Sequence, residues 1–397
     1  MATVAEELIR CLYDYGVRYV FGIPGGPSIP YIEAMRKNGI EFVLTANEQS
    51  AAIMADMVGR LTGVPGVCHG TFGPGAVNLA TGVGGALLDR SPLIALTTEV
   101  NDSQIGRRVQ MNIDHQALYR PLTKWTTRIS AANLHQTLAN AFRIAVSETP
   151  GPVHIGLPAG IEGDTVDSVM TPIFEKESIP VPDSCQLARA AEIIKNAKKP
   201  LVAVGLSAVR LGLHDAIREF VDHHNIPVVL TPMAKGMVPE THRCYAGVLF
   251  HAKSDCIAPI YSQADAVIAI GYDTIEFNYE SWMPVVPLIH LDSEAADITA
   301  EYGSVLSIQS DLAKSVAYLQ SLSLPEYDWD MVELKNCKTR MFQELLRNNG
   351  SFTSAELMTV LQSVLPEQGI VTSDVGAHLH LLGQLWKTSE PNGLLMT

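Results

Sequence analysis

Short apolar runs alternate with longer helical patterns in the first half of the chain. The runs have the length and composition of buried strands, and they cover residues 19–22, 41–44, 66–69 and 93–96. Because a helix after each strand returns the chain to the same end of the sheet, the alternation predicts parallel strands with helices on both faces. Residues 151–158 are predicted to form the closing strand of this first sheet.

The same alternation repeats in the second half. Strands are predicted at residues 201–205, 226–231, 266–271 and 288–292, with a helix at 215–221. A third α/β unit begins near Ser351, with a strand at 369–374 and an apolar helix at 378–386. The predicted fold class is α/β, with consecutive doubly wound parallel-sheet domains. The predicted parts are a first domain at 1–165, a linker rich in proline and acidic residues at 166–184, a second domain at 185–345 and a third at 346–397.

Composition and charge exclude some partners. The formal net charge is -14, whereas nucleic acids and anionic membranes attract basic surfaces, so neither is expected as a partner. Charged residues make up only 18% of the chain, which suggests that other subunits cover part of the surface. The six cysteines show no CxxC pair, the N-terminus lacks the features of a signal peptide, and no run approaches the ~20 apolar residues of a membrane span. We therefore expect a cytoplasmic location.

Glu48 begins a helical pattern, and a glycine-rich turn at residues 69–78 follows about twenty residues later. Thr45 and Glu48 have the spacing of a capping box, and an acidic group in the first turn complements the helix dipole. A purely structural role for Glu48 is therefore one interpretation.

Four segments in order favour a second interpretation. They are residues 20–27, Glu48, residues 73–79 and residues 89–97. Together they resemble the pyrimidine-binding domain of thiamine diphosphate enzymes, most closely the group of acetohydroxyacid synthases, catabolic acetolactate synthases and pyruvate oxidases. The resemblance is close over about the first 165 residues and looser beyond. It implies a pyrimidine-binding domain at 1–165, a central Rossmann-like domain at 185–345 and the N-terminal fragment of a diphosphate-binding domain at 346–397.

The resemblance also implies site residues. In that family, the glutamate that matches Glu48 holds N1′ of the cofactor's aminopyrimidine and so promotes loss of the thiazolium C2 proton. The expected apolar surroundings of this carboxyl are Ala51, Ala52, Ile53, Met54 and Phe72. The expected cofactor contacts are Pro24, Gly25, Gly26, Phe72, Gly73 and Asn78, with Gly376 and His378 near the diphosphate.

The glycine-rich turn has alternatives of its own. Such a turn can hold a phosphate at a helix N-terminus. However, no GK[ST] follows, and Asn78 stands where a dinucleotide fingerprint has its last glycine, so close backbone approach to a flat ring is the better account. Gly82, Gly84 and Gly85 weaken the following helix and predict that another helix lies close. In the family that helix belongs to a second subunit, so a homodimer or homotetramer is expected.

Other candidates carry weaker signals. Gln110 lies near a family glutamine that faces the reacting carbonyl, but Met111 matches equally well, and a surface loop is the alternative. His115 and the pair at 223–224 are interpreted as surface or capping histidines. His378 forms only an HxH pair with His380, so no metal ligand is assigned.

Two further expectations concern cofactors. No GxGxxG follows a strand, and residues 271–277 lack the arginine that flavin-binding relatives carry after the matching glycine, so FAD is not expected. The chain stops at Thr397, before the Gly-Asp-Gly motif and asparagine that hold Mg²⁺ in the family. We therefore expect the Mg²⁺ ligands beyond Thr397, a chain truncated in its diphosphate-binding domain, and no activity from residues 1–397 alone.

The predicted function is decarboxylation of a 2-oxo acid, pyruvate, with thiamine diphosphate and Mg²⁺, followed by carboligation to an acceptor carbonyl. The alternatives are other chemistry of the family, such as a decarboxylase, an oxidase or an acetyltransferase, and a catalytically silent binding or dimerisation module. The sequence leaves the acceptor, the number of subunits and any regulatory subunit open.

Overall fold

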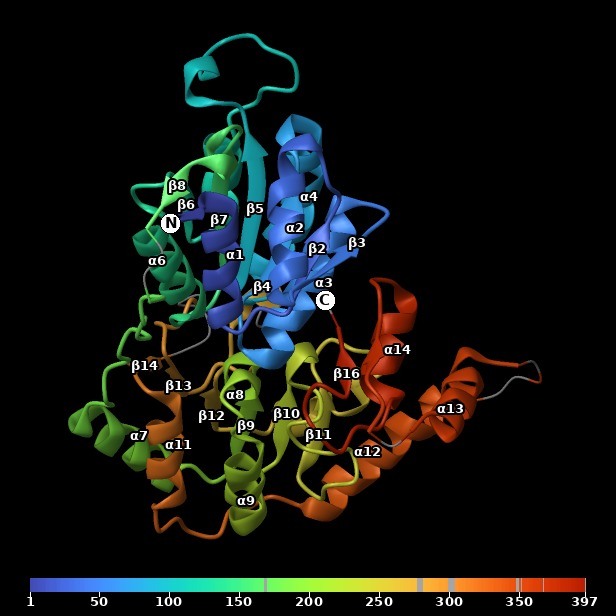
Figure 1. Cartoon of the computed structure of the whole chain (residues 1–397). Helices are drawn as coiled ribbons and strands as arrows, with labels where there is room; N and C mark the ends of the chain where they lie inside the picture. The colour runs from blue at the N-terminus through green and yellow to red at the C-terminus, as the bar shows by residue number, and fades with distance from the viewer. Residues whose placement is uncertain are drawn as a thin grey trace. The chain divides into compact units, whose positions relative to one another are not determined.

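The computed structural model describes residues 1–167, 170–276, 281–298, 304–347, 350, 352–366 and 368–396. The chain forms two compact units, Met1–Ser178 and Ile179–Thr397, which we describe separately (Figure 1). Ser351, Thr397 and the last residue of the segment 271–277 lie outside the described residues. The finer division, with a linker at 166–184 and a third domain from 346, stays a prediction.

Unit 1 is built around a six-stranded sheet in the order β3-β2-β4-β5-β7-β6, and every neighbouring pair is parallel. The strands are β2 (Tyr19–Gly22), β3 (Glu41–Leu44), β4 (Gly66–Gly70), β5 (Leu93–Glu99), β6 (Trp125–Arg128) and β7 (Pro152–Pro158). The predicted parallel sheet is confirmed. One strand escaped prediction: β6, with three polar residues out of four, forms the edge beside β7. The strand β7 at 152–158 is the last strand of this sheet in the sequence, but it lies inside the sheet, between β5 and β6.

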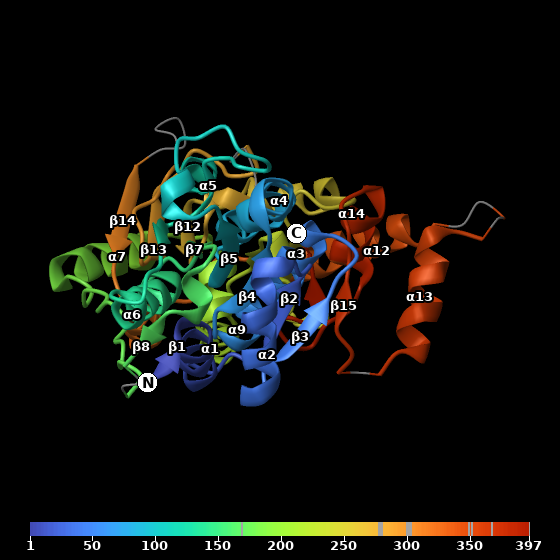
Figure 2. The ribbon, with the colours of Figure 1, turned by 45° about the horizontal axis from the view of Figure 1, so that its top comes forward.

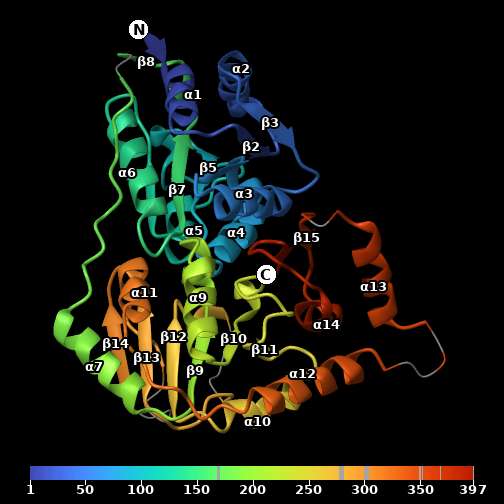
Figure 3. The same ribbon diagram turned by 90° about the horizontal axis from the view of Figure 1, so that it is seen from below.

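Helices cover both faces of this sheet. They are α1 (Val4–Asp14), α2 (Ile29–Asn38), α3 (Glu48–Thr62), α4 (Phe72–Leu88), α5 (His115–Tyr119) and α6 (Leu134–Val146). Ile94 and Leu96 of β5 belong to the core under α1, α2 and α6, whereas Leu93 and Ala95 belong to the core under α3 and α4. Figure 3 shows the two layers of helices. Two short strands, β1 (Ala2–Thr3) before these elements and β8 (Thr165–Val166) after them, form an antiparallel pair.

The glycines of α4 have different neighbours. A Cβ on Gly82 would lie 2.6 Å from the Cβ of Ala52 and 2.9 Å from the carbonyl oxygen of Gln49, both in α3. The close helix predicted at this glycine is therefore α3 of the same chain, so Gly82 gives no support to a dimer. A Cβ on Gly84 would only touch Leu122, and one on Gly85 would meet nothing within 4 Å.

This difference predicts opposite effects of two matched substitutions. Gly82→Ala should destabilise unit 1 by about 1–3 kcal/mol, because overpacking against α3 outweighs the gain in helix propensity. Gly85→Ala should be neutral or stabilising by up to ~1 kcal/mol, since its methyl group enters open space. Urea unfolding of both variants measures the two changes. Equal losses for the two would mean that a second subunit covers Gly85.

Unit 2 contains a second six-stranded parallel sheet, in the order β11-β10-β9-β12-β13-β14. Its strands are β9 (Pro200–Val204), β10 (Val228–Leu230), β11 (Tyr245–Val248), β12 (Ala266–Ile270), β13 (Leu288–Asp292) and β14 (Val305–Gln309). The sequence predicted the four inner strands and missed the two edges, β11 and β14.

The helices of unit 2 also lie on both faces of the sheet. They are α7 (Ser184–Asn196), α8 (Leu206–Arg210), α9 (His214–His224), α10 (Ala258–Tyr261), α11 (Leu312–Gln320), α12 (Met331–Leu345), α13 (Ser354–Val364) and α14 (Ala377–Leu385). Figure 2 shows α12, α13 and α14 in orange and red, and α12 and α14 contact β11. The predicted strand at 369–374 is only two residues long, β15 (Val371–Thr372), and it pairs in parallel with β16 (Leu394–Leu395).

A buried ion pair contacts the segment that follows α14, the last helix of unit 2. Lys235 and Glu240 are almost wholly buried, and the Lys235 ammonium donates to Glu240 Oε1. Glu240 Oε2 accepts a second hydrogen bond, from the backbone N of Thr388, at 3.1 Å. Burial lowers the pKa of Lys235, while the Glu240 carboxylate acts in the opposite direction. The pair therefore ties residue 388 to the central part of the unit.

In the part of the chain that the structure describes, no helix is both long enough and apolar enough to span a membrane. The six cysteines are free thiols.

Candidate functional site

The two loops predicted to contact a ligand meet at one edge of the unit 1 sheet. Parallel α/β sheets bind ligands beyond the carboxyl ends of their strands, where neighbouring connections run in opposite directions. In unit 1 this point lies between β2 and β4, because β3 follows β2 on one side and β4 lies on the other. A Cβ on Gly25, after β2, would lie 2.7 Å from the Cγ2 of Thr71, after β4. Pro24 and Gly26 flank Gly25 and are exposed.

Ser28 and His69 hold the loop after β2. The backbone N of Gly25 donates to Ser28 Oγ at 3.1 Å, and Ser28 Oγ lies 2.7 Å from His69 Nε2. Burial lowers the pKa of His69 to about 4, and a hydrogen bond with the Leu96 backbone acts in the opposite direction. A neutral imidazole can accept a hydrogen bond from the Ser28 hydroxyl. Ser28 Oγ is thereby fixed as the acceptor for the Gly25 amide.

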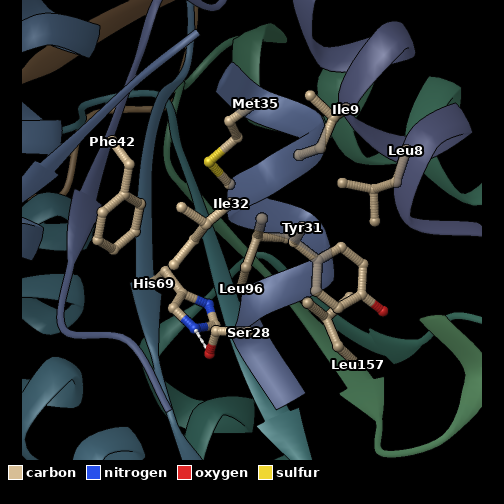
Figure 4. A pocket seen from close by; sticks show the side chains of 10 residues that line it. All are labelled: Leu8, Ile9, Ser28, Tyr31, Ile32, Met35, Phe42, His69, Leu96 and Leu157. Atoms are coloured by element: carbon tan, nitrogen blue, oxygen red, sulfur yellow. Dashed lines mark hydrogen bonds between the residues drawn. The ribbon is translucent and has the colours of Figure 1, made fainter. Parts of the chain in front are cut away.

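A small cavity lies beside this pair. Figure 4 shows Ser28 and His69 facing each other at its edge, with apolar side chains such as Leu8, Met35 and Phe42 around the rest. Its volume of about 10 Å³ leaves room for one water molecule at most. It is a gap in the core, too small for a cofactor.

Glu48 occupies the first position of α3, but it takes no part in a capping box. The N-cap is Asn47, whose side chain accepts a hydrogen bond from the backbone N of Gln49 at 2.7 Å. The Thr45 hydroxyl donates to the backbone oxygen of Asn47 at 2.9 Å. The capping box between Thr45 and Glu48 is therefore wrong, because the N-cap lies two residues after Thr45, the cap that the spacing suggested.

The Glu48 carboxyl is buried and held on one side only. The residue is 8% exposed, and its Oε2 accepts a hydrogen bond from Asn78 Nδ2 of α4 at 3.1 Å. A Cβ on Gly75 would lie 3.2 Å from Oε1. Among the described residues, Oε1 accepts no hydrogen bond. Asn78, predicted as a cofactor contact, thus orients one oxygen of Glu48 and leaves the other for a ligand.

The apolar surroundings expected for Glu48 are only partly present. Ala51 and Ala52 are fully buried and lie on the same side of α3 as Glu48. Ile53 and Met54 are each 43% exposed, so their predicted place around the carboxyl is wrong. The reason is the helical period: α3 turns positions 53 and 54 away from the sheet.

The glycine-rich turn forms the first turn of α4, which begins at Phe72. The backbone N of Phe72 donates to Thr98 Oγ1 at 3.2 Å, and that of Gly73 donates to the backbone oxygen of Met111 at 2.9 Å. A Cβ on Gly73 would lie 2.6 Å from this Met111 oxygen, so the close approach requires glycine. The contact brings the loop with Met111 and the exposed Gln110 beside the turn.

A buried row of hydrogen bonds runs across β5, β7 and β6 and reaches α5. Thr97 Oγ1 is 2.8 Å from His115 Nδ1 and 2.7 Å from His154 Nε2. Thr126 Oγ1 is 2.7 Å from His154 Nδ1 and donates to Gln116 Oε1 at 2.8 Å. Thr126 must therefore accept from His154, Thr97 must donate to His154, and His115 must donate to Thr97. Burial lowers the pKa of His115 to about 4 and lowers that of His154 well below its usual value. Both rings are therefore neutral near pH 7.

The row corrects one prediction and adds residues that the sequence did not suggest. His115 is 3% exposed, so its interpretation as a surface or capping histidine is wrong. Tyr119 stacks on His154 with ring centroids 4.1 Å apart, and its hydroxyl donates to the backbone oxygen of Ala76 in α4 at 2.7 Å. The available signal was a polar residue directly after an apolar run, such as Thr97 after residues 93–96.

The remaining candidates belong to unit 2. Gly376 is the N-cap of α14, and a Cβ on it would lie 2.8 Å from the ring of His378. His378 and His380 are both exposed. A role for Gly376 and His378 at a diphosphate stays a prediction. His223 and His224 end α9, the first exposed and the second half-buried, as interpreted from the sequence.

Three groups of side chains in the described residues have metal-ligand spacing. They are Glu7, Cys11 and His135; Glu99, His115 and His154; and Asp222, His242 and Cys244. In each group the carboxylate already pairs with an arginine, at position 10, 128 or 243. Since Mg²⁺ prefers oxygen ligands, we assign none of the three to it.

Two family models match the chain. The model described as thiamine pyrophosphate enzyme, N-terminal TPP binding domain, matches residues 2–118, and the model described as thiamine pyrophosphate enzyme, central domain, matches residues 187–319. The first match includes Glu48, Asn78 and the glycine-rich turn.

Curated relatives agree with these matches. The chain is 30% identical over 423 residues to a probable acetolactate synthase large subunit of Methanocaldococcus jannaschii. This match covers 98% of this chain and 70% of the relative. It is 29% identical over 410 residues to an acetolactate synthase of Bacillus subtilis, covering 99% of this chain and 71% of the relative. It is 30% identical over 401 residues to the acetolactate synthase isozyme 3 large subunit of Escherichia coli, covering 95% and 69%.

Proposed function

Because the chain belongs to the thiamine pyrophosphate enzyme family, we propose that it uses thiamine diphosphate to decarboxylate pyruvate and to join the product to an acceptor carbonyl, as an acetolactate synthase. The observation that carries the proposal is the Glu48 carboxyl, buried beside the glycine-rich turn with one oxygen held and the other available. The similarity to acetolactate synthases over nearly the whole chain supports the choice of reaction.

The residues around Glu48 fit the pyrimidine part of this cofactor. Glu48 Oε1 can share a proton with a ring nitrogen, while Asn78 keeps Oε2 in place. Pro24 and Gly26 offer an exposed loop, and the Ser28–His69 pair fixes the Gly25 amide beside it. When bound, thiamine diphosphate supplies the carbon that attacks the 2-oxo group and takes up the electrons released on loss of CO₂.

The loop beside the glycine-rich turn is proposed to face the substrate. The backbone oxygen of Met111 accepts a hydrogen bond from Gly73, and the neighbouring Gln110 is exposed. We assign Gln110 the task of donating to the substrate carbonyl. The half-buried Phe72 shields the same place from water.

The proposal includes assembly and cofactors. We propose a homodimer or homotetramer, supported by the apolar residues that α3 and α4 expose, namely Ile53, Met54, Leu61, Val77 and Leu88. We propose that Mg²⁺ neutralises the diphosphate and that FAD is absent. The six free thiols support a cytoplasmic location. Light scattering at micromolar concentration checks the assembly, and a monomer would contradict it.

The reaction is tested with the full-length protein, pyruvate, thiamine diphosphate and Mg²⁺. The expected product is 2-acetolactate, measured as acetoin after acid treatment. Acetaldehyde as the sole product would replace the proposal by a decarboxylase, and pyruvate-dependent O₂ consumption by an oxidase. Absence of any pyruvate consumption, with the protein folded, would favour the silent binding module.

A further inference from the structure

Unit 2 has the strand order of a dinucleotide-binding fold. Counted from β9 as the first strand, the order β11-β10-β9-β12-β13-β14 reads 3-2-1-4-5-6. Folds of this order hold a phosphate at the end of the first strand, against the amides that open the following helix. In unit 2 this position lies where β9 ends and α8 begins at Leu206.

A side chain of the protein already lies at this position. Glu276 Oε1 accepts a hydrogen bond from the backbone N of Leu206 at 3.1 Å, and its Oε2 accepts one from the backbone N of Met233 at 3.0 Å. Leu206 follows β9, Met233 follows β10, and Glu276 ends the short helix Thr274–Glu276 after β12. One carboxylate thus joins the carboxyl ends of three neighbouring strands, and it uses both of its oxygens, as a bound oxyanion would.

Glu276 is half-buried as a residue, and its two carboxyl oxygens face the Leu206 and Met233 amides. Burial raises its pKa to about 7, while the Thr231 hydroxyl and the two amides act in the opposite direction. The amides therefore recover part of the solvation that the carboxylate has lost.

The backbone of the two strands beside Glu276 is closely packed. A Cβ on Gly205 would lie 2.3 Å from the backbone oxygen of Gly271, and one on Gly271 would lie 2.5 Å from the backbone N of Ala208. The turn after β9 and the end of β12 are therefore in direct contact. A phosphate or pyrophosphate could reach the Leu206 and Met233 amides only by displacing the Glu276 carboxylate.

We propose that unit 2 carries its own ligand, the Glu276 carboxylate, in the phosphate position of the fold, and that removing this side chain leaves a site for a small carboxylate such as formate. The inference concerns unit 2 alone and does not rest on the proposed function of the chain. It gives a physical reason to expect no flavin dinucleotide there.

The test is chemical rescue of Glu276→Ala in the full-length protein. We expect the variant to unfold at a lower temperature than the wild type, and sodium formate at 0.1–0.3 M to recover at least half of the loss relative to sodium chloride at the same ionic strength. Wild type and Glu326→Ala, which removes an exposed carboxylate of unit 2, should show no difference between the two salts. Phosphate should rescue less than formate, because two amides match two carboxylate oxygens. Equal curves in formate and chloride would overturn the proposal, and phosphate rescuing better would replace the carboxylate by a phosphate site.

Two further measurements keep the proposal open to failure if Glu276→Ala does not fold. Its refolding yield from urea should rise with formate and not with chloride, and equal yields would contradict the proposal. Glu276→Gln keeps one acceptor but points its NH₂ group at the second amide, so its stability should lie between those of wild type and Glu276→Ala. A glutamine variant as stable as wild type, or micromolar binding of FAD to the wild type in calorimetry, would also overturn the proposal.

Discussion

Replacing Glu48 by glutamine is expected to slow C2 hydrogen exchange of bound thiamine diphosphate by on the order of 100-fold or more, the scale of losing an acid-base partner. A glutamine has the same shape and can still accept from Asn78, but it cannot share a proton with a pyrimidine nitrogen through the atom that replaces Oε1. Hydrogen-deuterium exchange followed by NMR measures this step without product formation. Acetolactate formation should fall by a similar factor.

The structure separates this effect from helix stability. Because Asn47 is the N-cap of α3, Asn47→Ala should cost about 1 kcal/mol in urea unfolding and leave the exchange rate nearly unchanged. Glu48→Gln should show the opposite pattern, with little loss of stability. Glu41→Gln, at an exposed glutamate of β3, controls for charge. An unchanged exchange rate in Glu48→Gln would remove Glu48 from the proposed chemistry, even if acetolactate synthesis itself is confirmed.

Lys235→Met is expected to destabilise unit 2 by about 3–5 kcal/mol, the cost of leaving one member of a buried ion pair without its partner. Glu240 would then retain only the hydrogen bond from the Thr388 backbone in a buried position. The double variant Lys235→Met with Glu240→Gln should be more stable than Lys235→Met alone, because a neutral amide needs no counter-ion and can still accept from Thr388.

Urea unfolding monitored by tryptophan fluorescence measures Lys235→Met, Glu240→Gln and the double variant. The coupling is the loss of stability in the double variant minus the sum of the losses in the two single variants. Lys335→Met, at an exposed lysine of α12, is the matched control and should change stability by less than about 0.5 kcal/mol. If the losses from the two single substitutions simply add in the double variant, Lys235 and Glu240 do not act as a pair.

The sequence predicted the central strands well and the edges poorly. Inner strands such as β9 and β12 are covered on both faces, so nearly every position is apolar. The edge β6 is half-buried and reads Trp-Thr-Thr-Arg, and the edge β11 contains a glycine. Neither has a continuous apolar run that distinguishes a strand from a loop.

The positions of the site loops could be predicted, but the partners of their side chains could not. Parallel strands place all their carboxyl ends at one edge, so the loops after β2 and β4 had to meet. Which of Thr45 and Asn47 caps α3 depends on the extended backbone of Asn47, with φ -153° and ψ 143°. The contact between Ser28 and His69 joins residues 41 positions apart, and no local pattern encodes it.

The buried row from Gln116 to His115 has a direction. Gln116 Nε2 faces Glu99 Oε1 at 2.7 Å and the backbone oxygen of Thr127 at 3.1 Å, and both can only accept. Gln116 Oε1 is therefore the acceptor for the Thr126 hydroxyl. This fixes which atom donates in each of the following hydrogen bonds of the row. At the far end, His115 Nε2 keeps its lone pair. The orientation of the Gln116 amide thus sets the tautomer of His115, four hydrogen bonds further along, and it does so without moving any charge.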